Sequence, residues 1–94
     1  MTRPVVVNLR RQEYDVYIGR GSKWGNPFSH LPRSEAPWKA SDRPDAIRRY
    51  ADWIPTQPDL MAALSELAGK RLGCYCAPLP CHGDVLAGLV AALE

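Results

Sequence analysis

The stretch that decides the fold is residues 71–93, which read RLGCYCAPLPCHGDVLAGLVAAL. Its first six residues place leucine and cysteine at every second position, which is the period of a β-strand. After a short Pro-rich loop, apolar residues recur at the spacing of an amphipathic helix from about Cys81 to Leu93. The stretch therefore predicts a strand, a turn and a helix.

The rest of the chain supplies the elements against which this strand and helix would pack. Val5, Val6 and Val7 form a β-branched run, which is typical of a strand buried on both faces. The predicted elements are, in order, a strand at Pro4–Leu9, a short strand at Asp15–Ile18, a Gly- and Pro-rich loop over 19–40, a helix that begins after Ser41 or Asp42 and ends before Pro55, a helix from Pro58 to Gly69, the strand at 71–76 and the final helix. This order predicts a small single-domain α/β sandwich over residues 1–94. It would have a short, mostly parallel sheet, about three helices, and parallel first and third strands.

The composition is that of a folded soluble protein. Hydrophobic residues make up 46% of the 94 residues and charged residues 23%, a balance unlike that of disordered chains. No apolar run approaches the roughly 20 residues that a membrane-spanning helix needs, and the N-terminus lacks the apolar stretch of a signal peptide. We therefore expect a cytoplasmic protein with no membrane partner.

The net charge of +2 is unevenly distributed along the chain. Residues 1–50 contain ten Lys and Arg against five Asp and Glu, whereas residues 51–94 contain two against five. A positive first half suits a phosphate-bearing partner, although it falls short of a polybasic sequence, and the preference for Arg also follows from a GC-rich genome. The expected partner is therefore a phosphorylated small molecule or a nucleic acid.

The turn after the third predicted strand contains all three cysteines of the chain, unlike the even, widely spaced set of a disulfide scaffold. Cys81 and His82 fall at the start of the final helix, where free backbone amides and the helix dipole stabilise an anion or a thiolate. We assign Cys76 or Cys81 as a nucleophile, His82 as an acid or base, and Asp84 as an orienting or second acid. On this interpretation Cys81 reacts with an alkylating agent in the folded protein, whereas Cys74 reacts only after unfolding.

Two other interpretations of the same turn stay open. Cys74, Cys76, Cys81 and His82 have the ligand types of a Cys3His zinc site, and zinc is the one cofactor that the sequence suggests. Their spacing differs from that of the usual C-x2–4-C zinc knuckle. Alternatively, Cys74 and Cys76 alternate with Leu72 on the strand and act as small apolar residues of the core.

A second segment with candidate functional residues is Gly19–Phe28, which reads GRGSKWGNPF. Its candidate ligand-binding residues are Arg20, Ser22, Lys23, Trp24 and Asn26. The cations can contact phosphate, the tryptophan offers a stacking face, and the glycines let the backbone approach a ligand. The same composition also describes an ordered turn with a packed tryptophan, and no helix follows directly as in a Walker loop or a dinucleotide fingerprint.

The two segments are expected to share one site. Ligands of α/β sheets bind at the carboxyl ends of the strands, and that edge carries the arginines at 10–11 and the Cys-His turn. We therefore predict that Arg20, Trp24, Cys76 and His82 surround a single pocket.

Together, GRGSKWGNPF at 19–28 and GKRLGCYCAPLPCHGDVL at 69–86 closely resemble a bacterial and phage family, domain of unknown function 4326. The resemblance covers nearly the whole chain, including the predicted helix at 47–53. It implies a small, single-domain, intracellular α/β protein. It implies no reaction, because none is established for the family.

Two main functional hypotheses follow. In the first, the chain binds a nucleotide, a nucleic-acid end or another phosphorylated ligand, with or without catalysis by the Cys and His residues. In the second, the chain is a non-enzymatic module that binds nucleic acid or protein. Arg48 and Arg49 would then contribute to a basic face, and the Cys-His cluster would be structural or zinc-bound.

Overall fold

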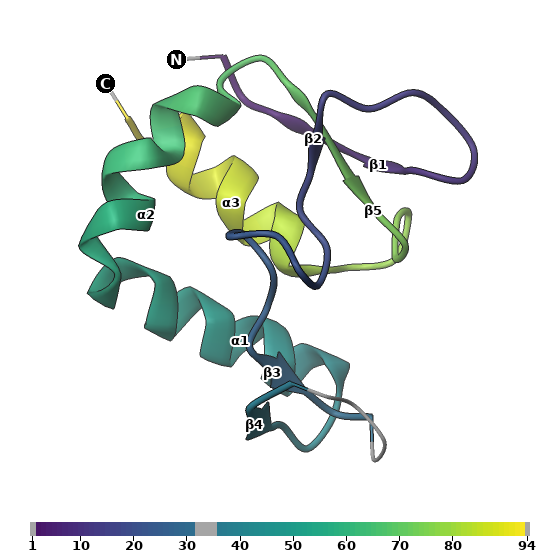
Figure 1. Ribbon diagram of the computed structural model, residues 1–94, viewed down its shortest axis with the longest axis vertical. Coiled ribbons are helices and arrows are strands. Elements are labelled where there is room, and N and C mark those ends of the chain that lie inside the picture. Colours follow the sequence, from purple (N-terminus) through teal and green to yellow (C-terminus); the bar gives the residue numbers. More distant parts are fainter. Residues whose placement is uncertain (1, 32–35, 94) are drawn as a thin grey trace.

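Short strands and helices follow one another in the order expected for a small α/β domain (Figure 1). The computed structural model describes residues 2–31 and 36–93. The elements are β1 (Val5–Asn8), β2 (Val16–Tyr17), β3 (Phe28–Ser29), β4 (Trp38–Lys39), α1 (Arg43–Trp53), the 3-10 turn η1 (Ile54–Thr56), α2 (Pro58–Ala63), the 3-10 turn η2 (Leu64–Leu67), β5 (Arg71–Cys74) and α3 (His82–Ala91). The predicted α/β class is confirmed.

Strand β5 lies at the centre of a three-stranded parallel sheet in the order β1–β5–β2. β1 pairs with β5 over its whole length, with Val5 opposite Arg71 and Asn8 opposite Cys74, and the shorter β2 pairs with the other edge. The prediction that the first and third predicted strands are parallel is confirmed. β5 ends two residues earlier than predicted, because the chain turns away after Cys74, whose carbonyl accepts a hydrogen bond from the Leu9 amide (3.0 Å).

The helices begin where their capping residues predict. α1 starts after Asp42, whose side chain accepts a hydrogen bond from a first-turn amide (2.9 Å), and Pro44 lies in that first turn. It ends before Pro55, which belongs to η1. The helix predicted from Pro58 to Gly69 is α-helical only in its first half and finishes as η2.

Helix α3 lies between the sheet and the other helices (Figure 1). It contacts β1 on one side, and α1 and η2 on the other. The large side chains that are fully buried include Ile18, Tyr50, Ile54, Leu64, Leu67, Leu72, Leu86 and Val90. One core therefore joins the sheet to α3 and α3 to the remaining helices. Within the described part of the chain, every helix is too short or too polar to cross a membrane.

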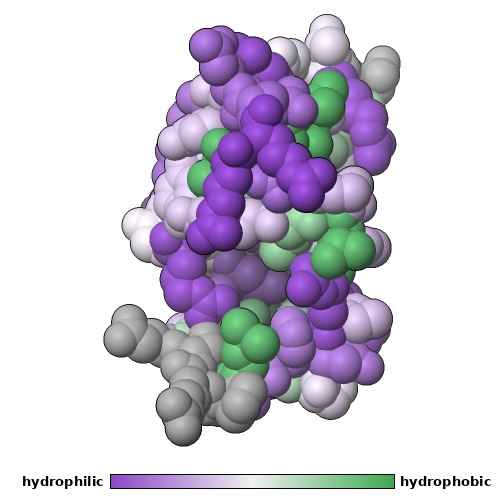
Figure 2. All heavy atoms as spheres, turned by 90° about the vertical axis from the view of Figure 1, so that its right-hand side faces the viewer, coloured by the Kyte–Doolittle hydropathy of each residue, from purple (hydrophilic) through white to green (hydrophobic). Residues whose placement is uncertain are grey.

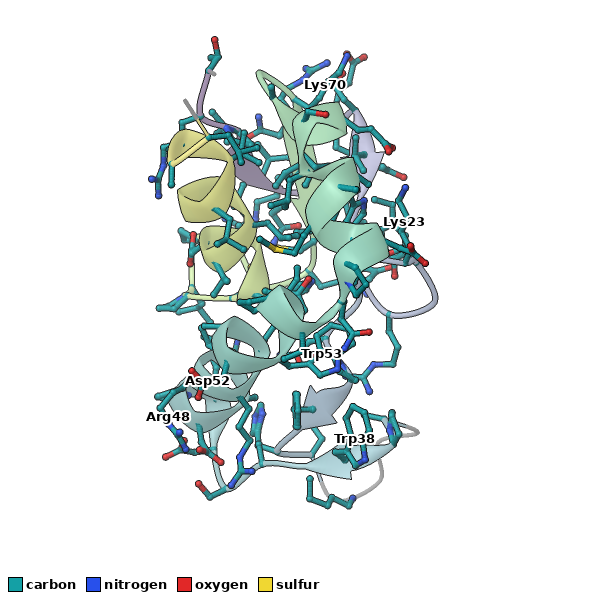
Figure 3. The ribbon with its side chains drawn as sticks, turned by 90° about the vertical axis from the view of Figure 1, so that its left-hand side faces the viewer. Lys23, Trp38, Arg48, Asp52, Trp53 and Lys70 are labelled. Atoms are coloured by element: carbon teal, nitrogen blue, oxygen red, sulfur yellow. The ribbon has the colours of Figure 1, made fainter. Side chains whose placement is uncertain are left out.

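The predicted loop over 19–40 contains a second, smaller sheet that the sequence did not predict. β3 and β4 pair in parallel, and the rings of Phe28 and Trp38 lie 5.2 Å apart between their centroids. Figure 3 shows Trp38 at the opposite end of the molecule from Lys70, which precedes β5. Strands of two residues have too few positions to show an alternating pattern, so periodicity could not indicate them. The part of this loop at 32–35 lies outside the described residues.

Tyr50 joins the segment after β2 to α1. Its side chain is fully buried, and its hydroxyl donates a hydrogen bond to the Trp24 carbonyl oxygen (2.8 Å). Burial raises the pKa of Tyr50 far above its ordinary value, so the hydroxyl stays a neutral donor. This bond holds the backbone of the Gly-rich segment against the first helix.

We predict that Tyr50→Phe lowers the free energy of unfolding by about 1–3 kcal/mol, because the buried Trp24 carbonyl loses its donor. Urea denaturation followed by circular dichroism measures the loss. Tyr14→Phe removes the hydroxyl of an exposed side chain and is the matched control, with an expected change within about 0.5 kcal/mol. Equal effects of the two substitutions would contradict a stabilising role for the hydrogen bond.

Candidate functional site

A cavity of about 320 Å³ opens beyond the carboxyl end of the sheet, between three segments of the chain. These segments are residues 17–31, which contain the end of β2 and the turn after it, the first turn of α1, and residues 74–82, which join β5 to α3. Figure 2 shows this face hollowed, with hydrophilic residues inside the hollow. The Gly-rich segment and the Cys-His turn therefore line one cavity, although they are far apart in the sequence.

The described wall of the cavity carries four basic side chains. Its arginines and histidines are Arg20, His30, Arg43 and His82, and none of its described lining residues is Asp or Glu. Three aromatic side chains add apolar surface: Tyr17, Phe28 and Tyr75. Both α1 and α3 contribute first-turn residues, and the N-terminus of a helix is the positive end of its dipole. This wall suits an anion that also has a flat apolar part.

Arg20 is held at the cavity by a turn with its own hydrogen bonds. The Tyr17 hydroxyl donates to the Arg20 carbonyl oxygen (3.0 Å), and the Ser22 hydroxyl donates to the Gly19 carbonyl oxygen (2.7 Å). Ser22 thus supports the turn from inside and is not part of the described cavity wall. The sequence prediction placed Arg20 and Ser22 together as ligand contacts, whereas only Arg20 faces the cavity.

Trp24 and Lys23 do not lie in the cavity wall. Trp24 is only 2% exposed and belongs to the core, so its ring offers no free face to a ligand. Lys23 lies on the outer surface (Figure 3), with its Nζ 3.2 Å from the Glu66 carboxylate and 5.3 Å from the centroid of the Trp24 ring. Burial of the large indole stabilises a small core, and this decides its position. The predicted pocket is therefore correct for three of its four residues and wrong for Trp24.

Asn26 lines the cavity, but its side-chain amide is already engaged. Its Nδ2 donates to the Ala46 carbonyl oxygen (3.1 Å), and its Oδ1 accepts from the Phe28 amide (2.9 Å). The bond to Ala46 fastens the segment after β2 to the first turn of α1, and the bond from Phe28 fixes the side-chain amide within its own segment. Asn26 therefore holds two walls of the cavity together.

Cys81 and Asp84 form the N-terminal cap of α3. The Gly83 amide donates to the Cys81 Sγ (3.3 Å), and the Cys81 amide donates to the Asp84 carboxylate (3.1 Å). This is the reciprocal pattern of a capping box, with a thiol in place of the usual hydroxyl. Asp84 is exposed and lies outside the described cavity wall, and its carboxylate caps the helix.

Cys74 and Cys81 touch each other inside the protein. Their Sγ atoms lie 3.4 Å apart, and the two residues are 2% and 3% exposed. The hydrogen bond from the Cys81 thiol lowers the pKa of Cys74 to about 6, whereas the neighbouring Cys74 sulfur and burial raise the pKa of Cys81. We expected the lowered pKa at the helix N-terminus, on Cys81. The sulfur contact places the lowered pKa on Cys74 instead, because a second negative charge beside an ionised thiol is disfavoured.

Cys76 is half-buried and lines the cavity, which makes it the most accessible of the three thiols. In the described ranges, 2–31 and 36–93, no three His, Cys, Asp or Glu side chains are grouped so that they could hold a metal ion. The three cysteines and His82 therefore do not converge as the ligands of one zinc ion.

His82 is fixed as a neutral imidazole. Its Nε2 lies 2.6 Å from the Ile18 carbonyl oxygen, which can only accept, so Nε2 carries the proton. The ring also meets the Tyr50 ring edge-on, with centroids 5.1 Å apart. Burial lowers the pKa of His82 below its ordinary value. No described residue donates a hydrogen bond to the other ring nitrogen, Nδ1. Every fully buried side-chain nitrogen among the described residues has a hydrogen-bond partner, so Nδ1 is not fully buried. It therefore reaches solvent, where it can accept a hydrogen bond.

Comparison with known proteins assigns the chain to a family. The model of a domain of unknown function, DUF4326, matches residues 6–92. The chain belongs to the DUF4326 family. A relative from Enterobacteria phage T4, described as an uncharacterized 12.4 kDa protein in the nrdA-td intergenic region, is 40% identical over 88 residues, which cover 94% of this chain and 78% of the relative. No solved structure matches the chain. The resemblance noted from the two motifs is confirmed.

Sequence reasoning missed several residues of the cavity in this DUF4326 chain. They are Tyr17, Phe28, His30, Arg43 and Tyr75. Arg43 had a local signal, because it is a cation at the first position of a helix, where acids are normally favoured. The other four had none, since an aromatic or histidine in a loop or short strand looks the same whether it faces a cavity or the outside.

We predict that folded His82 stays neutral at pH 7 with its proton on Nε2, and that acid weakens the fold through this residue. Because the pKa of His82 is lower in the folded chain, its contribution to stability is intact above the unfolded value of 6.5. That contribution is lost progressively as the pH falls below 6.5 toward the folded pKa, since the unfolded chain takes up the proton first.

Long-range proton–nitrogen NMR spectra read both the tautomer and the titration of this ring. The His30→Gln variant leaves a single imidazole and makes the assignment unambiguous. A proton on Nδ1 at pH 7, or a titration midpoint at or above that of a free histidine, would show that the contact with Ile18 does not govern the ring.

Proposed function

We propose that this DUF4326 chain binds a nucleotide in the cavity at the carboxyl end of its sheet. The observation that carries the proposal is the composition of the wall: two arginines, two histidines and no carboxylate among its described residues. A phosphate that leaves water needs charge compensation, and a guanidinium supplies it with two parallel hydrogen bonds.

Arg20 and Arg43 are the residues that we assign to the phosphate. They come from different walls, one from the turn after β2 and the other from the first position of α1. Arg20 lies close enough to His82 for its charge to contribute to the lowered pKa of that histidine, which puts a guanidinium near the start of α3. Backbone amides at this helix start are partly used by the cap, so the arginines carry most of the compensation.

The aromatic side chains and His82 would receive the base and sugar. Small-molecule sites typically measure roughly 300–1,000 Å³, and a cavity of about 320 Å³ has room for one nucleotide. The open Nδ1 of His82 accepts a hydrogen bond, so it suits a ligand hydroxyl or amino group better than a phosphate. The terminal nucleotide of a single strand has the same chemistry and would enter in the same way.

Binding is proposed ahead of catalysis because the groups for nucleophilic catalysis are engaged elsewhere. Cys76 and His82 both line the cavity, but the Nε2 proton of His82 is held by Ile18 and the Asp84 carboxylate by the helix cap. A nucleophile, a base and an orienting group need to contact one another in sequence. The Ile18 carbonyl orients His82, but no hydrogen bond joins Cys76 to His82 among the described residues, so the contact between nucleophile and base is absent there.

The alternative of a nucleic-acid-binding face on α1 is weakened by acids on the same helix. Arg49 Nε lies 2.8 Å from the Asp45 carboxylate, and Arg48 pairs with Asp45 and with Asp52 (3.7 Å). Figure 3 shows Arg48 and Asp52 projecting from the same side of α1. Arginines whose charge is balanced by neighbouring acids contribute little to the attraction of a nucleic-acid backbone.

We predict that nucleoside monophosphates bind measurably in isothermal titration calorimetry and bind more tightly than the matching nucleosides. Arg43→Gln should weaken binding roughly 10- to 100-fold, which is the loss of one charge-assisted hydrogen-bond pair. Arg11→Gln makes the same change of charge on an exposed residue outside the cavity wall and should leave the affinity unchanged.

Equal affinity for nucleoside and nucleotide would contradict the proposal that the cavity binds the phosphate. Equal weakening by the two arginine substitutions would show that net charge, and not the cavity, binds the ligand. Inorganic phosphate titrated alone reports whether the arginines suffice without the base and sugar.

A further inference from the structure

The contact between Cys74 and Cys81 has a geometry that neither capping nor packing requires. The two Sγ atoms are 3.4 Å apart and nearly excluded from solvent. One belongs to the last residue of β5 and the other to the residue that caps α3. Both residues belong to the wall of the cavity, in its part nearest the sheet. Two thiols held in this way form a reduced dithiol pair.

We propose that Cys74 and Cys81 are a redox site, which a hydroperoxide oxidises to an intramolecular disulfide. A disulfide has a sulfur–sulfur distance of about 2.05 Å, so closure needs the two sulfurs to approach by roughly 1.4 Å. Side-chain rotation and small shifts of the turn between the two residues supply such a movement. This proposal does not rest on the nucleotide binding proposed above, although both sites share the cavity.

The surroundings of Cys74 favour it as the attacking thiolate. Its sulfur lies 3.4 Å from the Cys81 sulfur, and this contact, with a smaller effect of the nearby Ala77 and Cys76 backbone, lowers the pKa of Cys74. A lowered pKa favours the thiolate, which is the nucleophilic form of cysteine. Cys81 keeps its proton and lies in contact, as a resolving thiol must.

The reaction balances with a hydroperoxide as the only oxidant. The Cys74 thiolate attacks the nearer oxygen of hydrogen peroxide, the O–O bond breaks, and the leaving hydroxide takes up a proton to form water. The resulting Cys74 sulfenic acid is attacked by the Cys81 sulfur, which loses its proton, and a second water leaves as the disulfide forms. Two thiols and one peroxide thus become one disulfide and two waters.

Because the thiol pair is almost completely buried, only a small oxidant can reach it. Hydrogen peroxide is scarcely larger than water and can reach a pair that is 2% and 3% exposed by way of the cavity. Bulky alkylating agents should instead label Cys76, which is half-buried and lines the same cavity. The expectation that Cys81 is alkylated in the folded protein is replaced by this one.

The test uses Cys76→Ala, which removes the accessible thiol and leaves only the proposed pair. The folded variant is treated with one equivalent of hydrogen peroxide, quenched with an alkylating agent under denaturing conditions, and weighed intact by mass spectrometry. We expect a monomer lighter by two hydrogen atoms that accepts no alkyl group, and full recovery of two alkylation sites after reduction. Circular dichroism before treatment confirms that the variant is folded.

Cys74→Ala is the matched comparison, because it keeps Cys81 beside the more accessible Cys76. This variant should form an intramolecular disulfide more slowly than Cys76→Ala does, or not at all. An intramolecular disulfide at the same rate in both variants would overturn the assignment of the pair. So would two free thiols, or a linkage between two chains, in peroxide-treated Cys76→Ala under conditions that oxidise free glutathione.

Discussion

The first turn of α3 packs directly against the sheet at Gly83, where an added side chain would have to displace its neighbours. A Cβ atom at Gly83 would lie 2.8 Å from Ile18 Cδ1, closer than real side-chain contacts allow. This approach brings Cys81 Sγ to Cys74 Sγ and His82 Nε2 to the Ile18 carbonyl oxygen. The thiol pair, the neutral histidine and one wall of the cavity therefore all lie where the first turn of α3 meets the sheet.

The same contact explains why residues of the Cys-His turn serve the fold and the candidate site together. Cys81 caps α3 through its sulfur, although a thiol is a weaker acceptor than the hydroxyl of serine or threonine at this position. A cysteine at this position therefore caps the helix less strongly than serine or threonine would, but its sulfur contacts that of Cys74. The proposed redox site accounts for that exchange, which helix stability by itself does not.

Charge is separated along the sheet in a way that supports an anion at its carboxyl end. At the other end of β5, the Asp15 carboxylate accepts hydrogen bonds from the Arg71 amide (2.8 Å) and guanidinium (3.1 Å), which lowers the pKa of Asp15 to about 2. On α1, Asp45 is paired with Arg49 and its neighbour Arg48. These acids are engaged outside the cavity, whose described lining residues include two arginines and two histidines.

Local signals in the sequence were sufficient for the three strands of the main sheet and for the helices, but not for the short strands β3 and β4. The valine run at 5–7 predicted the first strand, and Pro44 with its preceding cap predicted the start of α1. The alternating residues before Cys76 predicted a strand and the periodicity after Cys81 a helix, because these patterns act over a few neighbouring residues. Boundaries were less accurate: β5 stops at Cys74, where tertiary contacts turn the chain.

The sequence by itself determined which residues could carry chemistry, whereas only the tertiary structure decided where each of them faces. Trp24 has a side chain that could stack on a ligand, yet it lies in the core. Arg43 lines the cavity because α1 packs beside the segment after β2. The direction of the pKa shifts at Cys74 and Cys81 also follows from their contact. The physical reason is that burial, charge pairing and sulfur–sulfur distance are properties of groups brought together from separate elements, and no local pattern of residues records them.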